Sequence, residues 1–145
     1  MTYLVPDEAI SPEFINRRNA GTLPGHLGIE LTEVRRDGTA GGFVIAAHHM
    51  APNGYLHAGS LVTLADTLCG IACSASLPAR AAGFTTIELK SNFFATATEG
   101  HVEGIATPVH LGGTTQVWDC EVKHRETGKR MALFRCTQMV LSPRT

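Results

Sequence analysis

An aspartate inside an apolar segment is the residue of this 145-residue chain best placed to do chemistry. The segment LHAGSLVTLADTLCGIACSASL suits a helix of about 20 residues, with Asp66 as its one formal charge. Removing a carboxylate from water is costly unless it is paired or its environment is used for catalysis. Asp66 therefore either caps a backbone group or pairs with an arginine across a subunit contact, or it is a catalytic carboxylate.

The start of the same segment could stabilise a negatively charged oxygen. His57-Ala58-Gly59-Ser60 follows the Pro52-Asn53-Gly54 loop, and the small side chains of Ala58 and Gly59 allow close approach. The first N–H groups of a helix have no internal partner and lie at the positive end of its dipole. A thioester carbonyl placed there would have its developing oxyanion stabilised. This start, two turns before Asp66, favours the catalytic interpretation.

The cysteines and histidines do not form a metal-ligand pattern. Cys69 and Cys73 would share a helical face, but no histidine or second cysteine pair with ligand spacing lies nearby. His48-His49 reads as a loop pair. We expect no metal, and we expect all four cysteines to be buried, reduced thiols, namely Cys69, Cys73, Cys120 and Cys136.

The rest of the chain reads as one short helix and about six strands. Ser11-Pro12 predicts a helical segment at about residues 11–20, ending before Gly21. Asp37-Gly38 predicts a hairpin turn between two strands. Glycine-containing breaks separate four later strand-like runs. The expected strands are Leu27–Arg36, Gly41–Ala47, Phe84–Phe94, His101–Pro108, Thr114–Lys123 and Met131–Leu141.

One buried helix with about six hairpin-linked strands gives an α+β domain that occupies residues 1–145. A helix that is apolar or small all round needs cover on most sides, so the antiparallel sheet must wrap around it. This arrangement is the hotdog fold. Its outer face and its edges invite pairing with a second copy of the chain.

Composition limits the function and the location. Hydrophobic residues make up 43% and charged residues 17%, so a packed core can form. The net charge of −1 argues against nucleic acid, whose phosphates need a basic face. We see no signal peptide and no uncharged stretch that would span a bilayer. The expected location is cytoplasmic, without a membrane partner.

Three motifs, over roughly residues 25–141, resemble one branch of the hotdog superfamily. They are NGYLHAGSLVTLADT, TTIELKSNFF and HLGGTTQVWDCEVKHRETGKRMA. They are similar to the phenylacetyl-CoA and 4-hydroxybenzoyl-CoA (PaaI-like) thioesterases, whose signature is His-Gly-Gly followed by a helix with an acidic residue nine positions after the histidine. The resemblance implies hydrolysis of an acyl-CoA, with an aromatic or a short- to medium-chain acyl group, to free acid and CoA.

The resemblance also implies residue roles. Asp66 would be the general base or the nucleophile, and the Ala58 N–H would bind the oxyanion with help from His57. Thr86 matches a position where family members carry a hydroxyl near the attacking water. Contacts with the CoA part of the substrate are assigned to Asn53, Gly59, Lys90, His110, Gly112 and Gly113.

Four positions depart from the family pattern. Ala58 replaces the first glycine of the signature, and Ala51 stands where many members have Asn or Gln to position water. Gly70 stands where Ser or Thr is frequent, and Gly113 replaces a common arginine. These departures bear on rate and CoA affinity more than on fold.

Two other functions fit the same residues. A non-catalytic acyl-CoA binding module would use the same helix and pocket, and Ala51 favours it slightly. A hotdog dehydratase would release no free thiol. For the thioesterase we expect no cofactor, because CoA is part of the substrate. We also expect a homo-oligomer, a dimer or a dimer of dimers (a homotetramer), with active sites shared between subunits. That expectation rests on geometry, because Ala58 and Asp66 lie about 12 Å apart along one helix at about 1.5 Å per residue.

Overall fold

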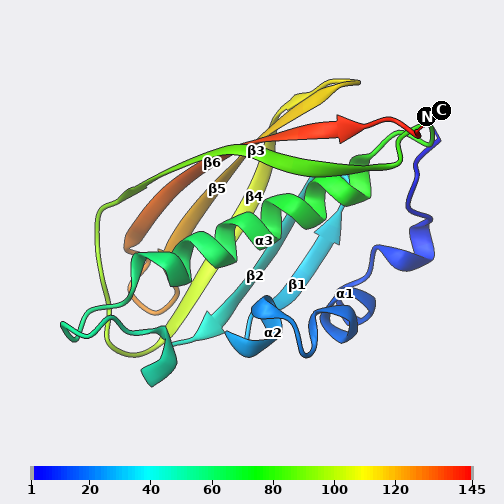
Figure 1. The fold of residues 1–145 in the computed structure, drawn as a ribbon. Coiled ribbons are helices and arrows are strands. Elements are labelled where there is room, and N and C mark those ends of the chain that lie inside the picture. Colours follow the sequence, from blue (N-terminus) through cyan, green and yellow to red (C-terminus); the bar gives the residue numbers. More distant parts are fainter. Residues whose placement is uncertain (1, 145) are drawn as a thin grey trace.

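A computed structural model describes residues 2–144 and contains a six-stranded sheet curled around one long helix (Figure 1). The strand order is β1-β2-β4-β5-β6-β3, and every neighbouring pair is antiparallel. This is the hotdog arrangement that the sequence predicts. The strands are β1 (Glu30–Arg35), β2 (Gly38–Val44), β3 (Gly83–Phe93), β4 (His101–Leu111), β5 (Thr115–His124) and β6 (Arg130–Leu141). The helices are η1 (Asp7–Ala9), α1 (Pro12–Asn19), α2 (Leu23–His26), η2 (Ala47–His49) and α3 (Ala58–Ser76).

The central helix α3 is buried because small and apolar residues surround most of its circumference. Ten of its 19 residues are buried, including Leu64 and Leu68, which are fully enclosed. The helix ends at Ser76, since Pro78 disfavours helical geometry at Leu77. By length and apolarity alone α3 could cross a membrane, but here it is the core helix covered by the sheet (Figure 1). Trp118, on the sheet, is also fully enclosed in this core.

The N-terminal segment docks beside β1 and continues the cover over α3 (Figure 1). Helix α1 begins as predicted, because the Phe14 N–H donates to the Ser11 side chain at 3.2 Å. The Asn16 carboxamide then pairs with the Leu31 backbone, donating to its carbonyl at 3.0 Å and accepting from its N–H at 2.8 Å. These two bonds fix α1 against the edge of the sheet.

The N-terminal hairpin differs from the prediction in its boundaries. The first strand was expected to start at Leu27, but it starts at Glu30, because the one-turn helix α2 and the turn that follows it come directly before it. Pro24 suits the first turn of α2. The second strand runs over Gly38–Val44, because the tight turn pairs Arg35 directly with Gly38. It gives way to η2, where the prediction had continued the strand to Ala47.

Candidate active site

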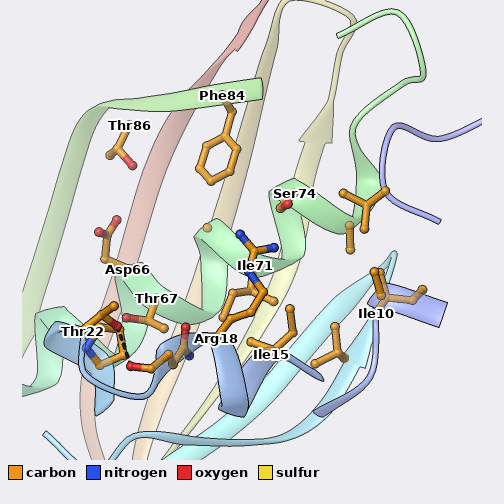
Figure 2. Close-up of a pocket in the computed structure, with 17 residues that line it drawn as sticks. Ile10, Ile15, Arg18, Thr22, Asp66, Thr67, Ile71, Ser74, Phe84 and Thr86 are labelled. Carbon is orange, nitrogen blue, oxygen red and sulfur yellow. Dashed lines mark hydrogen bonds between the residues drawn. The ribbon is translucent and has the colours of Figure 1, made fainter. Parts of the chain in front are cut away.

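Asp66 lies at a cavity of about 390 Å³ between α3, β3 and the N-terminal segment (Figure 2). Helical periodicity explains its direction. Leu64, Ala65 and Leu68 are buried in the core. Another face of α3 looks into the cavity and carries Asp66, Thr67, Gly70, Ile71, Ser74 and Ala75. The carboxylate therefore sits in an otherwise small and apolar wall.

The Asp66 carboxylate is poorly solvated. Its Oδ1 atom is buried and has no hydrogen-bond partner within residues 2–144. Burial raises the pKa of Asp66 above its usual value, and the neighbouring Thr86 hydroxyl opposes that rise. Figure 2 shows the polar ends of Asp66 and Thr86 facing one another. The structure thus brings together two residues that the sequence assigns to the reaction.

A third residue, Gln138, completes this group and was not identified from the sequence. It is fully buried on β6, directly opposite Thr86 in the strand register. The Thr86 hydroxyl donates to Gln138 Oε1 at 2.8 Å, and Gln138 Nε2 donates to Cys136 Sγ at 3.3 Å. A carboxamide within a run of strand residues carries no sequence signal of this role, because the partner residue is 52 positions away.

The start of α3 is held in place by His49. The His49 carbonyl accepts hydrogen bonds from the His57 N–H and from the Ser60 hydroxyl, both at 2.9 Å. Its ring is also occupied, since Nδ1 accepts from the Ala46 N–H at 2.9 Å and Nε2 donates to the Leu27 carbonyl at 2.7 Å. Burial lowers the pKa of His49. His49 thus has a structural role. It lies on the short helix η2, where a loop was expected from the sequence.

The His57 ring is oriented by the first turn of α3. The Gly59 N–H donates to His57 Nδ1 at 2.8 Å, so the neutral ring carries its proton on Nε2. A Cβ added at Gly59 would lie 2.9 Å from the same Nδ1 atom, so this close approach needs glycine. Ala58 is an exposed residue, and its N–H makes no hydrogen bond to the described part of the chain. Ala58 and His57 together present two hydrogen-bond donors.

Within one chain the first turn of α3 lies away from Asp66, as the eight-residue spacing between Ala58 and Asp66 predicts. Asn53 lies in the exposed turn before α3, where its Oδ1 accepts from the Tyr55 N–H at 3.1 Å.

The remaining sequence-assigned residues lie elsewhere. Lys90 pairs with Arg135 in the register, and both line a groove on the outer face of the sheet. His110 is exposed near the end of β4, just before Gly112 and Gly113. Neither Lys90 nor these three residues line the Asp66 cavity.

One arginine near Gly113 was not identified from the sequence. The Arg80 guanidinium lies against Gly113, in the space that a side chain at this position would need. Both residues line a smaller cavity that also includes Ser76, at the C-terminal end of α3. The chain therefore places an arginine beside the position where the family pattern has one, but from a different segment.

The four cysteines are buried and form no disulfide bond, in agreement with the sequence prediction. Across residues 2–144, no group of three or more His, Cys, Asp or Glu side chains is arranged to hold a metal ion. That the reaction needs no metal or cofactor stays a prediction.

The fold and this cavity define a hotdog-fold enzyme, and comparisons with known proteins identify its family. The thioesterase superfamily model matches residues 53–131. The proofreading thioesterase EntH of Cronobacter turicensis is 30% identical, over 89% of this chain and 93% of its own. The 1,4-dihydroxy-2-naphthoyl-CoA hydrolase of Escherichia coli is 29% identical, over 91% of this chain and 96% of its own. A thioesterase structure from Haemophilus influenzae superposes with a TM-score of 0.86 at 27% identity, covering 98% of this chain and 96% of that one.

The chain belongs to the thioesterase superfamily. It is a hydrolase, and the bond that it cleaves is a thioester.

Proposed function

We propose that this protein hydrolyses acyl-CoA thioesters, with Asp66 as the general base. The observation that carries the proposal is the Asp66 carboxylate itself, which faces a cavity and has a buried oxygen with no hydrogen-bond donor in the described part of the chain. A carboxylate with a buried oxygen that no donor reaches is a stronger base than a solvated one, because its charge is less stabilised. Relatives that act on thioesters, one of them named for a CoA substrate, support the choice of substrate class.

The proposed reaction needs two groups in addition to the base. Asp66 takes a proton from a water molecule, whose oxygen attacks the thioester carbon. The carbonyl oxygen becomes an oxyanion, and the Ala58 N–H with His57 Nε2–H stabilises it. The C–S bond then breaks, and the proton held by Asp66 passes to the CoA sulfur. Thr86, beside Asp66, is suited to orient the attacking water.

We infer that Asp66 of one subunit works with the helix start of a second. Reaction requires the attacker about 3 to 3.5 Å from the thioester carbon and the donors within hydrogen-bond reach of its oxygen. Along one helix, Ala58 and Asp66 are too far apart to meet both conditions. Two antiparallel copies of α3 related by a two-fold axis meet them, since each Asp66 then faces the other helix start.

The free edge of the sheet supports such a dimer. Strand β3 has 11 residues, ends the sheet, and leaves Ile87 52% and Leu89 43% exposed. A long apolar edge of this kind pairs readily with another strand. Because Thr86 is on β3, pairing there would bring the two Asp66 cavities to the subunit contact. The proposed contacts with CoA then lie outside the cavity, at Lys90, His110, Gly112 and Gly113.

The test is release of free thiol from aromatic, short-chain and longer-chain acyl-CoA substrates by the wild type and by Asp66→Asn. We expect the substitution to lower kcat by at least about 10²-fold, because the base is lost. It is nearly isosteric, so circular dichroism and the oligomeric state should not change. An Asp66→Asn protein that retains wild-type turnover would refute this mechanism, and a wild type that binds acyl-CoA without releasing thiol would indicate a binding module.

A further inference from the structure

The cavity beside Asp66 has a second polar region, which the reaction does not use. Arg18 and Asn19, at the end of α1, both line it. Figure 2 shows the Arg18 side chain directed from α1 toward α3, with its guanidinium away from the Asp66 carboxylate. Between these polar groups the walls are largely apolar, formed by Ile15, Ile71 and Phe84. A ligand in this cavity would therefore meet an acceptor at Asp66 and donors from the end of α1.

Neither side-chain donor makes a hydrogen bond or an ion pair within the described residues, and the Arg18 guanidinium lies 5.8 Å from the centre of the Phe14 ring. No carboxylate within residues 2–144 forms an ion pair with Arg18, and Asp66 is the only acidic residue in the cavity lining. The Asn19 Nδ2 atom is buried and makes no hydrogen bond within the same residues. A buried donor left unpaired costs about 1 to 3 kcal/mol, so a bound acceptor at this place would be stabilising.

Resting on the proposed function, we infer that the acyl group carries a carboxylate at its far end, which Arg18 and Asn19 bind. The substrate would be the CoA monothioester of a dicarboxylic acid with an apolar middle. The two ends of the cavity also determine the orientation of the bound substrate. Asp66 repels the free carboxylate and Arg18 attracts it, so the thioester end is left beside Asp66.

The length of the cavity suits such a group. It follows α3 from Asp66 to Ser74, eight residues or about 12 Å at about 1.5 Å per residue. Its volume of about 390 Å³ falls within the range of about 300 to 1,000 Å³ typical of small-molecule sites. An apolar middle would contact Ile71 and Phe84, and the far end would reach α1.

Arg17 separates this inference from the ordinary role of a basic residue at a helix end. Both Arg17 and Arg18 lie in the last turn of α1, where positive charge favours the helix dipole. Both are exposed, but only Arg18 lines the cavity. Arg17→Met is therefore a matched control for Arg18→Met.

The experiment compares kcat/KM for two matched pairs: octanoyl-CoA with suberyl-CoA, and benzoyl-CoA with 4-carboxybenzoyl-CoA. We expect the wild type to prefer the carboxylated member of at least one pair by about tenfold, the size of a charge-assisted hydrogen bond. Arg18→Met should abolish that preference, and Arg17→Met should retain it. A wild type that prefers the uncharged member of both pairs, or two variants with equal effects, would overturn the inference.

Binding to the Asp66→Asn protein separates this inference from the proposed function. Calorimetry with the same four compounds should show that the Asp66→Asn protein has the same preference in Kd. The preference should be lost when Arg18→Met is added to Asp66→Asn. Failure to hydrolyse any of the four would contradict acyl-CoA hydrolysis, whereas the binding preference would still support the carboxylate site. Hydrolysis without any preference in rate or Kd would refute the carboxylate site alone.

Discussion

The hydroxyl of Thr86 has one proton, and where that proton points determines how basic Asp66 is. In this structure Thr86 donates to Gln138 Oε1, which leaves the buried Asp66 Oδ1 without a donor. Gln138 is fully buried and does not line the cavity itself, but its side-chain oxygen accepts the hydrogen bond of Thr86, which does. We therefore regard Gln138 as a positioning residue, which acts on Asp66 through Thr86.

The rate of the wild type should fall as pH decreases through the pKa of Asp66, because only the ionised carboxylate accepts a proton. Burial raises that pKa, so the fall should begin at a higher pH than the usual value of 3.8 would give. Gln138→Met frees the Thr86 proton for Asp66, which lowers the pKa and moves the fall in kcat/KM to lower pH. Thr86→Val removes the hydroxyl altogether, so the fall in kcat/KM should lie at least as high in pH as in the wild type.

A double variant distinguishes positioning from a general loss of packing. If Gln138 acts through the Thr86 hydroxyl, adding Gln138→Met to Thr86→Val should not shift the pH profile further. Independent and additive shifts would show that Gln138 acts on Asp66 by another route.

At the level of the secondary-structure elements, an irregularity in β3 decides which residues face the cavity. The register of β3 against β6 shifts between Thr86 and Glu88, so one extra residue is inserted there. Residues an even number apart normally share a face of a strand. Without the bulge Thr86 and Lys90 would both face inward, but with it Lys90 lies beside Arg135 on the outer face.

This bulge illustrates what the sequence could and could not predict. The long helix and the six strands follow from apolar patterning, and the structure has them. The roles of Asp66 and Thr86 come from motif resemblance, and the structure places these two side chains beside one another. The side on which Lys90 lies depends on one inserted residue, and alternation alone cannot locate it. The roles of Arg80 and Gln138 depend on contacts between distant segments, which no local pattern encodes.

The first turn of α3 gives a second prediction at this level. Gly59→Ala would place a Cβ 2.9 Å from His57 Nδ1, which is too close, so the ring must turn away. We expect kcat to fall about tenfold, because His57 Nε2 then no longer points at the developing oxyanion. The thermal unfolding temperature should change little, since alanine suits the first turn of a helix. In a His57→Ala background the same substitution should have no further effect; a further loss would show that Gly59 acts in some other way.

For the whole molecule, the proposed shared site makes activity a property of the dimer. Asp66→Asn removes the base, and Ala58→Pro removes the N–H that would bind the oxyanion. Proline is tolerated at the first position of a helix, where Ala58 lies. In a mixed dimer both defects would fall in one site and leave the other site intact.

Mixing the two inactive variants should therefore restore activity. Random exchange makes about half of the dimers mixed, and each has one intact site, so about a quarter of wild-type activity should return. Native mass spectrometry can confirm that mixed dimers form. Mixed dimers that are as inactive as their folded parents would show that each subunit carries a complete site of its own.

The N-terminal segment and α3 meet at one cavity, yet they are encoded far apart in the chain. Ile15, Arg18 and Asn19 belong to a short helix outside the sheet, and that helix is fixed to β1 through the Asn16 carboxamide. With the acyl group bound in this cavity as proposed, changes in this segment would alter the acyl group accepted without disturbing α3 or the six strands. Substrate preference and bond cleavage can consequently diverge at different rates among descendants of this fold, and an engineer could exchange residues 5–24 as a cassette.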